Sequence, residues 1–177
     1  MPGDRRKDLE LALRENRGRR LIADWSARLS GACGHEISAS SFLSIEKTEE
    51  LKVAFFTKLR DGTEALKVNW IKQEQTELLT HLLDVSVAVG ALQVVLLSSV
   101  DRFIGGVYLP ANCVLRNVMA TWKVVEEDLS MATEDLQHGF CLEENFYTPA
   151  GHYVAEGIYD ISAWGAFARA RKESATH

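Results

Sequence analysis

The sequence LKVAFFTKLRDGTEALKVNWI, residues 51–71, carries the strongest pattern for secondary structure in the chain. Apolar side chains recur at every second position on both sides of the dipeptide Asp61–Gly62. A period of two is typical of β-strands, and Asp-Gly is a favoured turn between paired strands. The stretch therefore predicts an N-terminal β-hairpin. A helix over residues 45–59 is the competing interpretation, because several of its apolar residues could share one helical stripe.

Helical periodicity occurs on both sides of this stretch. Residues 4–30 predict a helix in two pieces, interrupted at Asn16–Gly18, because asparagine and glycine are common at helix ends. Residues 72–90 predict an amphipathic helix that ends at Gly90. Residues 111–125 predict a further core helix, entered from a proline.

Four more strands are expected in the second half of the chain. Residues 91–99 form a short, continuous apolar run, which is typical of a strand buried on both faces. Residues 129–132, 140–146 and 152–164 alternate or are rich in tyrosine and β-branched side chains. We therefore expect an α+β (mixed α/β) fold. Its mixed sheet would contain the N-terminal hairpin and a C-terminal antiparallel meander, with three to four packed helices.

Length and composition are those of an ordinary globular protein. The 177 residues are 46% hydrophobic and 25% charged, which predicts one domain over residues 1–177, with residues 1–3 and 169–177 frayed. No apolar run reaches the roughly 18 residues that a membrane helix needs, so no membrane partner is expected. The acids near the N-terminus and the odd set of three cysteines favour a cytoplasmic location.

Charge is distributed unevenly, although the net charge of the chain is only −5. Residues 4–28 contain eight basic and five acidic side chains, whereas residues 122–160 contain nine acidic side chains and a single lysine. Clustered charge of one sign attracts partners of the opposite sign, and tyrosine is typical of protein interfaces. The predicted contact residues are Glu126, Glu127, Asp128, Glu134, Asp135, Glu143, Glu144, Tyr147, Tyr153 and Tyr159.

Strand alternation refines this prediction. We expect Phe140, Leu142 and Phe146 to face the core, with some of the tyrosines facing outward. Adjacent acids in a strand, such as Glu143 and Glu144, point to opposite faces, which argues against a paired-carboxylate catalytic site. The leading hypothesis is a non-catalytic module, without cofactor, that binds another, basic protein. Toxin-neutralising or immunity proteins, accessory subunits and chaperones belong to this class, and the sequence predicts no oligomeric state.

A zinc- or cysteine-dependent hydrolase is the first alternative. Cys33, His35, His138 and Cys141 are chemically suited to tetrahedral zinc, and either cysteine could act as a nucleophile. The two pairs are far apart in the sequence, and no motif supplies a base or an oxyanion hole. We therefore favour a loop at Cys33, a turn at His138, and a position on the more polar strand face for Cys141.

Nucleic-acid binding is the second alternative. Residues 5–20 form a basic segment, and a basic helix is the electrostatic footprint of many nucleic-acid-binding proteins. Acidic side chains are interspersed in this segment, and the protein as a whole is negative. A solvated helix face is therefore the favoured interpretation of residues 5–20.

Overall fold

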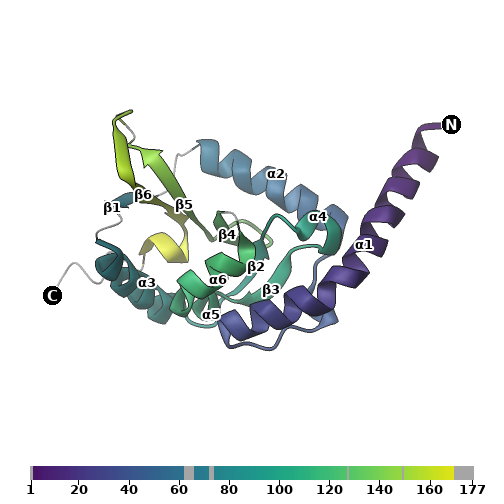
Figure 1. The fold of residues 1–177 in the computed structure, drawn as a ribbon, viewed down its shortest axis with the longest axis horizontal. Coiled ribbons are helices and arrows are strands. Elements are labelled where there is room, and N and C mark those ends of the chain that lie inside the picture. The colour runs from purple at the N-terminus through teal and green to yellow at the C-terminus, as the bar shows by residue number, and fades with distance from the viewer. Residues whose placement is uncertain (1, 62–65, 72–73, 127, 149, 170–177) are drawn as a thin grey trace.

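The protein was characterised as a computed structural model that describes residues 2–61, 66–71, 74–126, 128–148 and 150–169. The helical elements are α1 (Pro2–Cys33), the 3-10 turn η1 (Ala39–Ser41), α2 (Ile45–Asp61), α3 (Gln75–Val89), α4 (Asp101–Ile104), α5 (Ala111–Arg116) and α6 (Val118–Val125). The strands are β1 (Leu66–Ile71), β2 (Gln93–Leu97), β3 (Val107–Pro110), β4 (Leu129–Ala132), β5 (Gly139–Tyr147) and β6 (Tyr153–Trp164). Figure 1 shows how these elements are arranged.

The strands form one sheet in the order β1-β6-β5-β4-β2-β3. Each strand pairing is antiparallel, so the expectation of a mixed sheet is wrong, whereas the α+β class is confirmed. Strands β4, β5 and β6 pair in chain order, as the C-terminal prediction required. Strand β3 and helix α4 were not predicted; both lie between the strand expected at residues 91–99 and the helix expected at residues 111–125.

The predicted N-terminal hairpin is wrong in its first arm. Residues 45–61 form helix α2, and β1 pairs with the C-terminal strand β6. The helix forms because Ile45, Thr48, Leu51 and Phe55 recur at intervals of three or four residues and are all buried. Alternation suggested that Val53 shares a face with Phe55, but Val53 is 71% exposed. Asp61 ends α2, and the remainder of the expected turn lies outside the described residues.

Helix α1 is continuous, contrary to the expected interruption at Asn16–Gly18, and it begins at Pro2, within the segment expected to fray. Gly18 is buried inside the helix because α1 crosses α4 at very short range. A Cβ atom at this position would lie 1.9 Å from the carbonyl oxygen of Phe103. The glycine therefore permits a close approach of two helices and does not end one.

The other two predicted helices are closer to expectation. The helix predicted over residues 72–90 is confirmed as α3, with Gly90 at its C-terminal cap. The helix predicted over residues 111–125 is divided into α5 and α6 at Asn117, whose φ of −121° and ψ of 32° are not helical.

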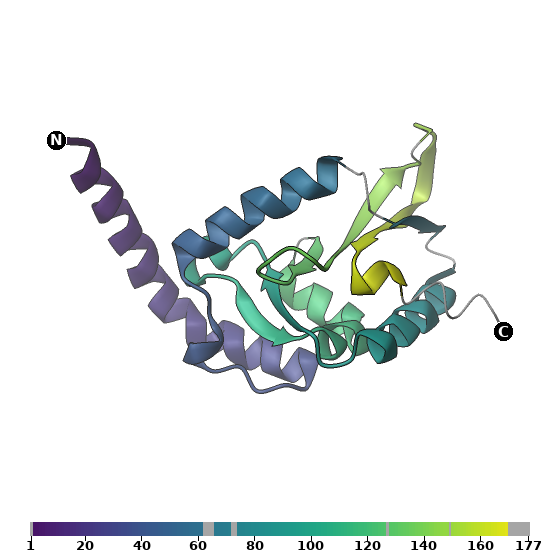
Figure 2. The same ribbon diagram turned by 180° about the vertical axis from the view of Figure 1, so that it is seen from behind.

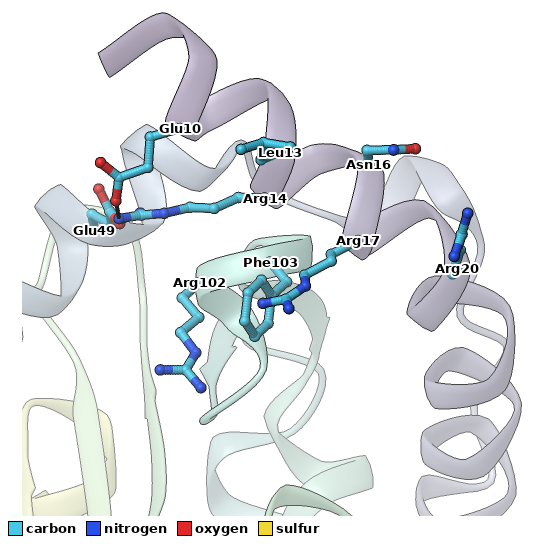
Figure 3. A pocket seen from close by; sticks show the side chains of 9 residues that line it. All are labelled: Glu10, Leu13, Arg14, Asn16, Arg17, Arg20, Glu49, Arg102 and Phe103. Carbon is cyan, nitrogen blue, oxygen red and sulfur yellow. Dashed lines mark hydrogen bonds and ion pairs between the residues drawn. The ribbon is translucent and has the colours of Figure 1, made fainter. Parts of the chain in front are cut away.

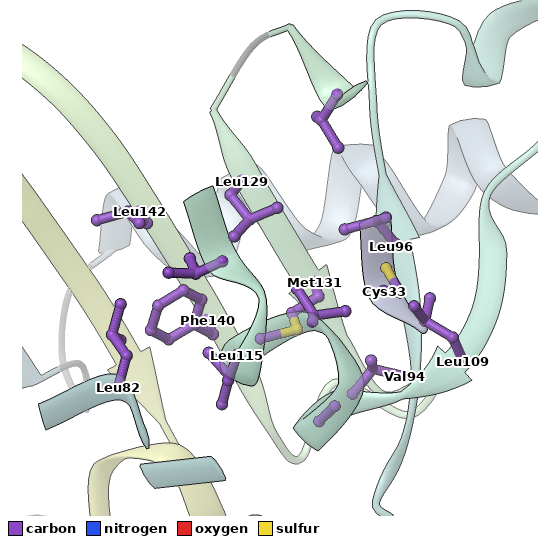
Figure 4. Packing of buried hydrophobic residues seen from close by; sticks show 14 of the residues in the cluster. Cys33, Leu82, Val94, Leu96, Leu109, Leu115, Leu129, Met131, Phe140 and Leu142 are labelled. Carbon is purple, nitrogen blue, oxygen red and sulfur yellow. The ribbon is translucent and has the colours of Figure 1, made fainter. Parts of the chain in front are cut away.

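Helices cover the two faces of the sheet unequally. Helices α1, α3, α5 and α6 cover one face, which we call the helix-rich face, and its buried core includes Leu96, Leu115 and Phe140 (Figure 4). Helix α2 covers the other face, which we call the α2 face (Figures 1 and 2). The buried core of the α2 face consists of Leu43, Leu51, Phe55, Val95, Leu97, Ala132, Cys141 and Trp164.

Candidate functional site

Strands β5 and β6 extend beyond their neighbours in the sheet. Strand β4 pairs with β5 only at residues 139–142, and β1 pairs with β6 only at residues 158–163. Beyond these limits the two strands pair with each other alone among the described strands. Residues 143–145 of β5 still pair with residues 158–160 of β6, which β1 flanks, so the strands form a two-stranded projection only past Asn145 and Ile158. We call residues 143–148 and 150–157 together the ribbon (Figure 1).

The end of the ribbon exposes three aromatic side chains. Tyr147 and Tyr153 are 61% and 64% exposed, as strand alternation allowed, and their rings meet edge to face with centroids 5.5 Å apart. Phe146 is 46% exposed, so the expectation that it faces the core is wrong. Phe146 has the same parity as Phe140 and Leu142, but it lies in the part of the ribbon that extends beyond β4 and β1.

The ribbon is also acidic. It contains Glu143, Glu144 and Glu156, and no lysine or arginine occurs in the sequence between Lys123 and Arg169. At its base, the Asn145 amide donates a hydrogen bond of 2.6 Å to the Asp160 carboxylate, which ties β5 to β6. The ribbon is therefore a projecting element that combines negative charge with exposed aromatic area.

The remaining predicted contact residues do not join the ribbon in one surface. Glu126 ends α6 and pairs with Arg28 of α1 at 3.2 Å, whereas Asp128 lies just before β4, beside Lys52. Glu134 and Asp135 lie in the turn between β4 and β5. Glu127 lies outside the described residues.

Two of the predicted contact residues have structural roles, and one of the two is buried. Tyr159 is only 4% exposed and packs on Trp122 of α6, so its prediction as a contact residue is wrong. Asp135 accepts hydrogen bonds from the Thr133 hydroxyl and the backbone N–H of Gln137, which hold the pKa of its carboxyl below the ordinary value. These bonds stabilise the turn before β5.

The cysteine and histidine candidates are not brought together. Cys33 ends α1 in the core of the helix-rich face, 3.4 Å from the Thr121 hydroxyl, so it does not lie in a loop as expected. Cys141 lies in the core of the α2 face, 3.2 Å from the Ser130 hydroxyl. The expectation that Cys141 occupies a polar face is wrong, because α2 covers that face. Among the described residues, no three His, Cys, Asp or Glu side chains are grouped to hold a metal ion.

Burial also makes these thiols poor nucleophiles. It is the largest cause that raises the pKa of both Cys33 and Cys141, and so keeps both thiols protonated at neutral pH. His138 lies at the end of the turn that precedes β5, as predicted. Its Nδ1 accepts a hydrogen bond of 3.0 Å from the backbone N–H of Ala166. This bond connects the turn to the segment after β6.

A second surface feature lies at the opposite end of the protein. A pocket of about 720 Å³ opens between α1, α2 and α4, and we call it the arginine pocket (Figure 3). Its lining residues are Glu10, Leu13, Arg14, Asn16, Arg17, Arg20, Glu49, Arg102 and Phe103. The basic character of residues 5–20 is evident in the sequence, but no sequence signal connects this segment with Arg102 and Phe103.

Comparisons with known proteins identify no relative. The chain matches no protein-family model, no curated protein and no solved structure at a significant level. None of the helices in the described part of the chain is long and apolar enough to cross a membrane.

Proposed function

We propose that this protein is a non-catalytic module that binds a basic partner protein through the ribbon. The observation that carries the proposal is the exposure of Phe146, Tyr147 and Tyr153 at the end of an acidic projection. Aromatic side chains provide large contact areas at a small cost in conformational entropy. Natural proteins rarely expose several of them together without a binding role.

The charge of the ribbon supplies the second part of the proposed mechanism. Carboxylates attract a basic surface over roughly one Debye length, about 10 Å at 0.1 M salt, and so increase the rate of encounter. The tyrosines then lose water against the partner and slow its dissociation. Neutralisers of basic toxins, chaperones and accessory subunits could all use such a contact.

The hydrolase alternative has less support. Its four candidate residues would have to meet in one site, but Cys33 and Cys141 lie in the cores of opposite faces of the sheet. We therefore do not propose a cysteine or zinc mechanism for these residues.

Site-specific photocrosslinking in the native cell tests the proposal. A photoreactive amino acid replaces Tyr147 in one variant and Thr80, which is exposed on α3, in the control variant. We expect a crosslink from position 147 to one basic protein, with no such product from position 80. Equal crosslinking from both positions, or none from position 147, would contradict the proposal.

Binding measurements with the captured partner then test the mechanism. We expect the paired reversal Glu144→Arg and Glu156→Arg to lower the association rate at least tenfold at 0.05 M salt. The paired change Tyr147→Ala and Tyr153→Ala should mainly raise the dissociation rate. Affinity that stays constant from 0.05 to 0.5 M salt would exclude the role of charge.

A further inference from the structure

The arginine pocket gathers positive charge that the described residues do not neutralise. Arg14 pairs with Glu10 at 2.9 Å and with Glu49, and these bonds raise its pKa. Arg17, Arg20 and Arg102 have no carboxylate partner among the described residues. Like charges three residues apart on a helix, as at Arg17 and Arg20, destabilise it slightly. A bound anion would remove this repulsion.

Arg17 and Arg102 share an aromatic support. The guanidinium carbon of Arg17 lies 5.9 Å from the centroid of the Phe103 ring, and that of Arg102 lies 4.8 Å from the same centroid. Figure 3 shows the two side chains reaching this ring from different helices, α1 and α4. Stacking on an aromatic ring orients a guanidinium and leaves its N–H groups available to a ligand.

The close crossing of α1 and α4 positions these groups. Gly18, which permits the crossing, is the residue next to Arg17, and the carbonyl oxygen that it approaches belongs to Phe103. The arginines therefore meet at a well-packed junction and not on two independent loops.

We propose that the arginine pocket binds a compact anion that carries at least two phosphate groups, such as a nucleoside di- or triphosphate. Guanidinium groups match phosphate oxygens in pairs. A terminal phosphate carries about −1.5 to −2 charges and each inner phosphate adds about −1, so a small ligand can engage several arginines. Leu13 and Phe103 add apolar surface for an organic group.

The carboxylates of the pocket favour a small ligand over a nucleic-acid strand. Glu10 and Glu49 lie beside Arg14 at one side of the pocket, where they would repel a phosphate backbone that continued past it (Figure 3). A compact ligand can bind at Arg17 and Arg102 without approaching these carboxylates. A single-stranded nucleic acid is the competing ligand that the experiment must separate.

Titration calorimetry at 0.1 M salt, without divalent cations, tests the proposal with pyrophosphate, ATP and a 20-nucleotide single-stranded RNA. We expect ATP and pyrophosphate to bind, and Arg17→Ala or Arg102→Ala to weaken each at least tenfold. The matched control is Arg19→Ala, which removes a charge from the same helix but not from the pocket. This control should change the affinity less than twofold, as should Tyr147→Ala in the ribbon.

Other outcomes would overturn the proposal. No binding of ATP or pyrophosphate at millimolar concentration would exclude a phosphate site. If Arg19→Ala lowered the affinity as much as Arg17→Ala, binding would reflect general electrostatic attraction and not the pocket. RNA that binds at least ten times more tightly than ATP, with the same dependence on Arg17 and Arg102, would identify a nucleic-acid surface instead. Thermal melts of each variant verify that it is folded.

Discussion

The two faces of the sheet differ in how completely helices cover them. Leu96 and Leu97 are neighbours in β2, both are essentially inaccessible to solvent, and they enter the cores of opposite faces. Four helices enclose the core around Leu96, whereas α2 is the main cover of the core around Leu97. The ribbon extends beyond strands β4 and β1 of the sheet (Figure 1). The arginine pocket lies between α1, α2 and α4 (Figure 3).

Truncation of each leucine compares the two cores directly. We expect Leu96→Ala to lower the free energy of unfolding by about 3–5 kcal/mol, because a large, enclosed core cannot collapse around the cavity. Leu97→Ala should cost about 2–3 kcal/mol, because α2 alone can shift toward the vacated space. Urea unfolding measures both values. Equal losses would contradict the idea that the α2 face is more adaptable.

The attachment of α2 depends on an ion pair with a buried acid. The Lys52 ammonium donates hydrogen bonds to the Asp101 carboxylate at 3.1 Å and to the Ser98 carbonyl at 3.2 Å, and Asp101 is 2% exposed. We expect Lys52→Met to destabilise the protein by about 2–3 kcal/mol, because it leaves a buried carboxylate unpaired. Lys47→Met, on the exposed surface of the same helix, is the control and should cost less than about 0.5 kcal/mol. Chemical denaturation distinguishes the two.

Two glycines of α1 should respond in opposite directions to alanine. Gly18→Ala forces a methyl group against α4, and we expect a loss of about 1–3 kcal/mol together with disruption of the arginine pocket. A Cβ atom at Gly31 meets nothing within 4 Å, so Gly31→Ala should stabilise the helix by up to about 1 kcal/mol. Thermal unfolding measures both signs. A stabilising Gly18→Ala would show that the helices separate without cost.

The buried cysteines make the stability of both cores depend on pH in the alkaline range. The pKa of Cys33 and of Cys141 is raised above the ordinary value of 9.0, so the unfolded chain ionises first as the pH rises. The stability that these thiols contribute is therefore complete below about pH 9 and declines above it. Replacing Cys141 with serine or alanine should reduce this alkaline loss, as measured by urea midpoints from pH 7 to pH 10.5.

The rates at which the cysteines of the native protein react with a thiol reagent give a further comparison of the two faces. Cys113 is half-buried and should react first. We expect Cys141, under the single helix α2, to react next through local opening, and Cys33 to react only on global unfolding. Mass spectrometry after iodoacetamide treatment gives the order. If Cys33 reacted faster than Cys141, the helix-rich face would open more readily than the α2 face, contrary to this expectation.

Local sequence patterns predicted where helices and strands occur, but not which distant residues they pack against. The α+β class, α3 and the three C-terminal strands were predictable, because each has a clear period in its own residues. The α2 segment has both periods at once, and burial of Thr48, Leu51 and Phe55 against the sheet decided in favour of the helix. Gly18 resembles a helix end in the sequence, because its neighbour Phe103 belongs to a distant segment.

The candidate sites show the same limit. The tyrosines of the ribbon were predictable from strand alternation, whereas the exposure of Phe146 required knowing that β5 and β6 extend beyond β4 and β1. Neither Arg102 nor Phe103 has a local pattern that points to the arginines of α1. Charge counted along the sequence also grouped Glu126 with Glu144, although the fold places Glu126 beside Arg28.

The pairing of β1 with β6 has a consequence for the order of folding. Leu66 lies opposite Ala163, so β1 can pair with its antiparallel neighbour β6 only after the intervening residues have been synthesised. Closing so long a loop is entropically slow, whereas α3 and the β4–β5 pair can assemble from nearby residues. During synthesis, the hydrogen-bonding groups of β1 therefore remain unpaired until β6 emerges, and during that time they can pair with wrong strands, which carries a risk of aggregation.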